Sequence, residues 1–138
     1  MYKEKALKYF NEGCNCAQSV FAAFATEYGM DEKEAMRLAS SFGGGMGQMR
    51  EVCGAMSGAL MALGLIEGYD DFDPNKKINH YQNVRAIADK FKEKNESIIC
   101  RELLSKAGDN KTPTGHNQAC VDFVCNACDI LQEHLNEK

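Results

Sequence analysis

The sequence predicts an all-α, single-domain bundle of about six or seven helices spanning residues 1–138, packed around a buried central helix at about residues 50–66. Apolar residues recur at helical spacing in several segments, and no segment shows the alternation of a strand. The stretch from Val52 to Ile66 contains no charged residue. A helix of this kind has no solvated face of ordinary width, so we place it at the centre of the fold.

Small residues follow one face of the predicted central helix. Gly54, Gly58 and Ala62 recur every four residues, which leaves a groove with almost no side chains. A second helix can approach closely along such a groove. We expect a crowded helix crossing inside the bundle, and the alternative is an interface in a homodimer.

The other helices are bounded by glycine, proline or capping residues. They are predicted over residues 2–11, 14–28, 31–42, 74–92, 97–104 and 119–135, with a loop at 108–117. Asp31 with Glu34 forms an acidic helix start, and Asp73 precedes a proline at the first position of a helix. In the fourth of these helices Ile78 and Tyr81 belong to the stripe that is predicted to face inward.

Composition and charge argue against several classes of partner. The chain has 16 basic and 20 acidic residues, a formal charge of -4, and its basic residues are scattered rather than clustered. This distribution is not that of a nucleic-acid-binding protein. The N-terminus lacks the apolar run of a signal peptide, and the uncharged central stretch is too short to span a bilayer. We therefore expect a cytoplasmic protein that does not insert into membranes.

Cys53 is the first candidate for a reactive thiol. A thiolate near a helix N-terminus is stabilised by the positive end of the helix dipole. Arg50 lies three residues earlier and adds a positive charge if the helix has already begun there. Gly44, Gly45 and Gly47 let backbone N–H groups approach a bound cofactor or substrate without obstruction by a Cβ. The alternative is that these glycines only permit a tight turn and that Cys53 is a small core residue.

Four of the seven cysteines lie at a helix start or on a buried face, each in a different predicted element. They are Cys16, Cys53, Cys100 and Cys120. We expect their sulfurs to gather beside the N-terminal end of the central helix. They would then serve as redox thiols, as an all-thiolate site for zinc or an iron–sulfur cluster, or as buried thiols of a helical interaction domain.

The one C-x-x-C pair does not support a separate site. Cys125 and Cys128 lie in the middle of a predicted helix, with Cys125 the more exposed, and they lack the strand–turn–helix setting of thioredoxin. Asp129 occupies the position at which a haem attachment motif has histidine.

Taken together, four segments resemble a known family. They are GCNCAQSV, FGGGMGQMREVCGAMSGALMALG, CRELL and CVDFV, which carry the four cysteines in order. This pattern is similar to that of the C_GCAxxG_C_C family of small redox-active proteins, and the resemblance covers nearly the whole chain. It implies an α-helical domain with four characteristic cysteines and a redox role. The segments also resemble the non-haem part of split-Soret cytochromes, which implies an iron–sulfur site.

These observations lead to one principal expectation. We predict a thiol–disulfide oxidoreductase or electron carrier in which Cys53 is the most thiolate-like cysteine. Cys16, Cys100 or Cys120 is its partner, and the substrate is a redox protein or a small molecule. Cys14 and the C-x-x-C pair fall outside the four family positions.

Overall fold

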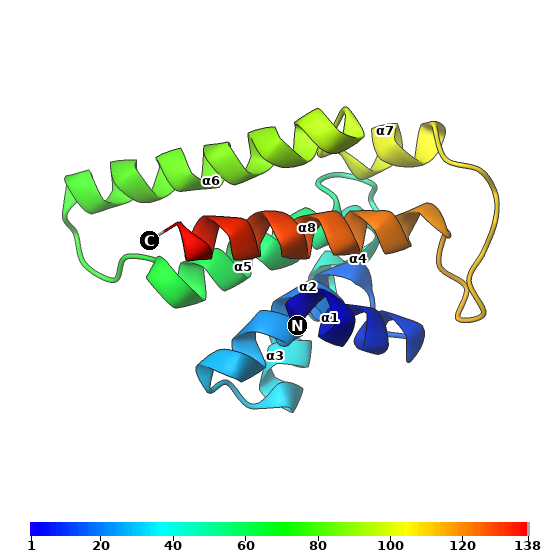
Figure 1. Ribbon diagram of the computed structural model, residues 1–138, viewed down its shortest axis with the longest axis horizontal. Helices are drawn as coiled ribbons and strands as arrows, with labels where there is room; N and C mark the ends of the chain where they lie inside the picture. The colour runs from blue at the N-terminus through cyan, green and yellow to red at the C-terminus, as the bar shows by residue number, and fades with distance from the viewer. Residues whose placement is uncertain (138) are drawn as a thin grey trace.

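The computed structural model describes residues 1–137, and these residues form a helical bundle (Figure 1). The helices of six residues or more are α1 (Tyr2–Asn11), α2 (Cys16–Ala25), α3 (Glu32–Ala39), α5 (Gly54–Glu67), α6 (Pro74–Asn95), α7 (Cys100–Ser105) and α8 (Ala119–Asn136). Two short 3-10 helices, η1 (Thr26–Tyr28) and η2 (Ser40–Phe42), and a four-residue turn, α4 (Gly43–Met46), connect them. Within the described residues no β-strand occurs, only two isolated bridges. The predicted all-α fold is confirmed.

Helix α5 lies at the centre, in contact with α2, α6 and α8. Its closest neighbour is α2. A Cβ added at Gly58 would lie 2.7 Å from the carbonyl oxygen of Ala17 and 3.2 Å from the backbone nitrogen of Phe21. The small-residue stripe therefore serves a close crossing within the chain, as expected.

The predicted start of the central helix is wrong by four residues. The helix begins at Gly54 rather than near residue 50, and Cys53 is its N-cap. Gln48 and Arg50 both have a φ of 63°, in the left-handed region, so the right-handed helix cannot include them. Val52 instead forms an antiparallel bridge with Ile99.

The capping residues explain where several helices begin. The Asn15 side chain accepts a hydrogen bond from the N–H of Gln18 at 2.8 Å, which starts α2 at Cys16. Asp31 accepts from the N–H of Glu34 at 3.2 Å, as predicted. Asp73 likewise caps α6, whose first residue is Pro74.

Helix α6 is less buried than its pattern predicts. Only Ile87 and Phe91 are buried, whereas Ile78 and Tyr81 are 52% and 47% exposed. Figure 1 shows the first turns of α6 extending beyond the ends of α5 and α8, so no helix covers this apolar stripe. None of the helices within residues 1–137 combines the length and the apolar character needed to cross a membrane.

Candidate functional site

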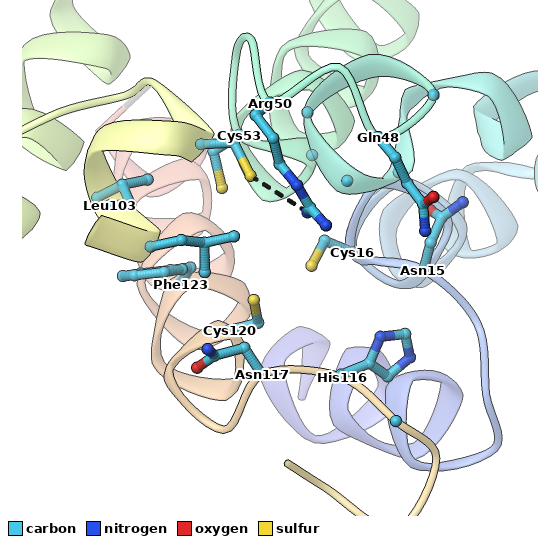
Figure 2. Close-up of a pocket in the computed structure, with 18 of the residues that line it drawn as sticks. Asn15, Cys16, Gln48, Arg50, Cys53, Leu103, His116, Asn117, Cys120 and Phe123 are labelled. Carbon is cyan, nitrogen blue, oxygen red and sulfur yellow. Dashed lines mark hydrogen bonds between the residues drawn. The ribbon is translucent and has the colours of Figure 1, made fainter. Parts of the chain in front are cut away.

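The cysteines Cys16, Cys53, Cys100 and Cys120 line a single cavity of about 470 Å³ (Figure 2). The cavity lies beside the N-terminal end of α5, where the sequence analysis expected these sulfurs to gather. Its wall also includes Arg50, Lys111 and His116, together with the predicted glycines Gly44, Gly45 and Gly47.

Each of the four cysteines begins a helix. Cys16 is the first residue of α2, Cys53 the N-cap of α5, Cys100 the first residue of the short α7, and Cys120 the second residue of α8. The N-terminal ends of the three longer helices thus meet at one cavity. Because a helix N-terminus carries a partial positive charge, this arrangement favours thiolates and other anions.

A short antiparallel strap holds Cys53 and Cys100 on the same wall. The Cys53 N–H donates to the carbonyl of Ile98 at 2.8 Å, and the Cys100 N–H donates to the carbonyl of Glu51 at 2.6 Å. The start of α7 is therefore tied to the segment that leads into α5, although about fifty residues separate them in sequence.

The glycine-rich turn winds in the left-handed sense. Five consecutive residues, from Gly44 to Gln48, have positive φ values of 65°, 71°, 69°, 57° and 63°. A Cβ at Gly45 would lie 2.7 Å from the Cβ of Cys100 and 2.8 Å from the Cα of Arg50. The non-glycine residues in this turn cost about 1–2 kcal/mol each. The glycines thus limit the strain and let the turn pack directly against Cys100.

This turn directs Arg50 into the cavity. Its Nη1 lies 3.8 Å from the Sγ of Cys100, and Figure 2 shows the side chain extending toward Cys16. The neighbouring carboxylate of Glu51 turns away and pairs with Arg101 at 2.7 Å. Arg50 therefore contributes its positive charge to the cavity, but from the turn before α5 rather than from the helix itself.

Cys16 and Cys120 shift each other's pKa in opposite directions. A hydrogen bond from the Cys16 thiol lowers the pKa of Cys120, and the charges of Arg50 and Lys111 lower it further against the opposing effect of burial. The same hydrogen bond, together with burial, raises the pKa of Cys16 well above its ordinary range. Of the two thiols, Cys120 is therefore the one whose ionisation is favoured.

Cys53 behaves differently from the prediction. Burial raises its pKa to about 12, although the backbone N–H groups of Ala55 and Met56 act in the opposite direction. The side chain is only 4% exposed. Loss of hydration thus outweighs the helix N-terminus, so the pKa of Cys53 is raised whereas that of Cys120 is lowered.

Two features of this site escaped the sequence patterns. Lys111 lies in the long loop before α8 and belongs to no recognisable motif. Its position near Cys120 becomes visible only in the folded chain. The position of Cys120 one residue after a predicted helix start was a usable signal, since it matches the argument made for Cys53.

Among residues 1–137, no group of three or more Cys, His, Asp or Glu side chains is placed so that it could hold a metal ion. All seven cysteines are free thiols. Cys14, Cys125 and Cys128 lie outside the cavity wall; Cys128 is fully buried and Cys125 partly exposed, as predicted.

Comparisons with known proteins agree with the cysteine pattern. The family model described as "Putative redox-active protein (C_GCAxxG_C_C)" matches residues 14–134. The chain is also 27% identical over 144 residues to an "Uncharacterized protein" of Archaeoglobus fulgidus, and the match covers 99% of this chain and 94% of that protein. No solved structure matches the chain.

Proposed function

The chain belongs to the C_GCAxxG_C_C family, and we propose that it carries out reversible thiol–disulfide exchange with Cys120 as the attacking thiolate and Cys16 as the resolving thiol. The observation that supports this assignment is that Cys16 and Cys120 line one cavity with Arg50 and Lys111, where the Cys16 thiol and the two positive charges lower the pKa of Cys120. A depressed pKa keeps a larger fraction of a thiol ionised near neutral pH, and the thiolate is the nucleophile.

The proposed exchange has two steps. The Cys120 thiolate attacks one sulfur of a substrate disulfide, so that a mixed disulfide forms and the second substrate sulfur leaves as a thiolate. Cys16 then passes its proton to a departing thiolate and attacks the Sγ of Cys120. A Cys16–Cys120 disulfide forms and the remaining substrate thiol is released. Two electrons pass from the cysteine pair to the substrate disulfide, which is recovered as one thiol that carries the Cys16 proton and one thiolate that takes a proton from water.

Cys53 and Cys100 complete the wall of this site. Arg50 acts on both walls of the site, since its guanidinium contacts Cys100 and its charge lowers the pKa of Cys120. In this proposal Cys53 stays protonated during exchange, because burial raises its pKa to about 12. It excludes water from the cavity rather than attacking the substrate.

Alkylation at varied pH tests the order of reactivity. Cys120 is expected to be modified first. As the pH rises, its alkylation rate is expected to reach a plateau before pH 9, the ordinary pKa of a thiol, because the pKa of Cys120 is lowered. Cys53 is expected to remain unmodified in the folded protein until the pH approaches about 12. Quantitative mass spectrometry after short pulses of N-ethylmaleimide measures both profiles. If Cys53 is modified before Cys120 at pH 7, the assignment of the nucleophile is wrong.

Disulfide mapping tests the resolving residue. The fully reduced protein is treated with less than one equivalent of 2-hydroxyethyl disulfide, quenched in acid and digested. The first intramolecular link is expected to join Cys16 and Cys120. A first link between Cys53 and Cys100, or a mixed disulfide on Cys120 that never resolves, would contradict the proposed pair.

A further inference from the structure

The cavity has a charge opposite to that of the whole chain. The protein carries 20 acidic and 16 basic residues, yet no aspartate or glutamate lies among the cavity-lining residues. The charged side chains of the wall are Arg50 and Lys111, and the N-terminal ends of three long helices add to their positive field. An acidic protein thus contains a distinctly positive pocket around its reactive sulfurs.

These two cations lack carboxylate partners. Among residues 1–137 neither Arg50 nor Lys111 forms an ion pair. Glu51, the carboxylate nearest to Arg50 in sequence, pairs with Arg101 instead. Both cations are therefore free to bind an anionic ligand.

His116 also lines the cavity. Its ring stacks on Phe10 with centroids 4.1 Å apart, and its Nε2 is shielded from solvent and makes no hydrogen bond within the described part of the chain. Figure 2 places His116 on the side of the cavity near Asn117 and Cys120.

The size of the cavity limits what can enter. Its volume of about 470 Å³ lies in the range of small-molecule sites, about 300–1,000 Å³. Cys16, Cys53, Cys100 and Cys120 all line this cavity (Figure 2).

We propose that the substrate of this cavity is a low-molecular-weight disulfide that carries carboxylate groups, held by Arg50 and Lys111 while its sulfurs face Cys120 and Cys16. This inference rests on the exchange reaction proposed above and names the class of substrate. The exchange itself follows the two steps already given, and the products are two small anionic thiols.

The first test compares three small disulfides that differ in charge. These are 3,3′-dithiodipropionate, which is anionic, 2-hydroxyethyl disulfide, which is neutral, and cystamine, which is cationic. For each small disulfide, the rate at which it forms the Cys16–Cys120 disulfide is divided by the rate at which it reacts with a simple free thiol. At low salt the normalised rate is expected to be about tenfold higher for the anionic than for the neutral probe, and lowest for the cationic one.

A charge variant and a matched control sharpen this test. Lys111→Gln is expected to remove most of the preference for the anionic over the neutral probe. Because this preference is a ratio, it does not depend on the ionised fraction of Cys120. Lys106→Gln removes a lysine that lies outside the cavity wall and pairs with Glu96, and it is expected to leave the ratio unchanged. Equal normalised rates for all three probes, with the Cys16–Cys120 link still forming, would overturn the substrate class and leave the exchange reaction standing.

A second measurement does not depend on exchange. Suberate is an unreactive dicarboxylate of the same chain length as dithiodipropionate, and 1,8-octanediol is its uncharged counterpart. Suberate is expected to slow the alkylation of Cys120 by the neutral reagent N-ethylmaleimide several-fold, and octanediol is not. If no disulfide reacts but suberate still protects, the exchange proposal fails and the anion site stands. If suberate gives no protection, the anion site is wrong.

Discussion

Replacing Cys120 with serine is expected to lower the rate of disulfide exchange by at least about a hundredfold, because a neutral hydroxyl takes the place of the proposed attacking thiolate. The hydrogen bond from Cys16 and the charges of Arg50 and Lys111 would then have no anion to stabilise. The rate is measured by stopped-flow detection of thiol release from a small disulfide at pH 7.

The matched control for this variant is Cys125→Ser. Cys125 lies in the same helix, α8, is partly exposed and does not line the cavity. Its exchange rate is expected to equal that of the unmodified protein. Similar rates in the Cys120→Ser and Cys125→Ser variants would show that the reactive thiol lies elsewhere, and Cys53→Ser and Cys100→Ser would then be compared in the same assay.

Replacing Gly58 with alanine is expected to lower the free energy of unfolding by about 1–3 kcal/mol, the usual cost of inserting a methyl group into a packed core. The added Cβ would lie 2.7 Å from the carbonyl oxygen of Ala17 and 3.2 Å from its Cα. Both are backbone atoms, so α2 and α5 must move apart rather than adjust a side chain. Urea titration followed by circular dichroism measures the change.

Gly64→Ala provides the control on the same helix. No atom lies within 4 Å of a Cβ added at Gly64, and the residue has ordinary helical geometry within α5. Alanine there is expected to raise the free energy of unfolding by about 0.5–1 kcal/mol, because glycine is the poorer helix former. If both glycine variants changed the unfolding free energy by the same amount, the close crossing of α2 and α5 would not be the reason that position 58 requires glycine.

The fold class and the outline of the site followed from local patterns. The uncharged run from Val52 to Ile66 identified the central helix because a helix without charge must be covered on all sides. Asp31 and Asp73 marked helix starts because their side chains accept hydrogen bonds from free N–H groups of the first turn. The four cysteines could be singled out because each falls at a helix start or in an apolar stripe.

The start of α5 could not be predicted in the same way. It depends on the left-handed turn at Gly44–Gln48 and on the pairing of Val52 with Ile99, a residue from a distant segment. The exposure of Ile78 and Tyr81 likewise depends on how far α6 extends beyond its neighbours. Periodicity indicates which face of a helix is apolar, but it does not reveal whether another helix reaches that face.

By itself the sequence determined an all-α protein built around an uncharged helix, with four cysteines in separate elements, each at a helix start or on a buried face. Only the tertiary structure decided in which direction the pKa values of Cys53 and Cys120 move. Burial raises the pKa of Cys53, whereas Cys120 receives a hydrogen bond from Cys16 and the charges of Arg50 and Lys111. The physical reason is that the ionisation of a thiol depends on hydration and on charges within a few ångströms, and both are set by segments far apart in the chain.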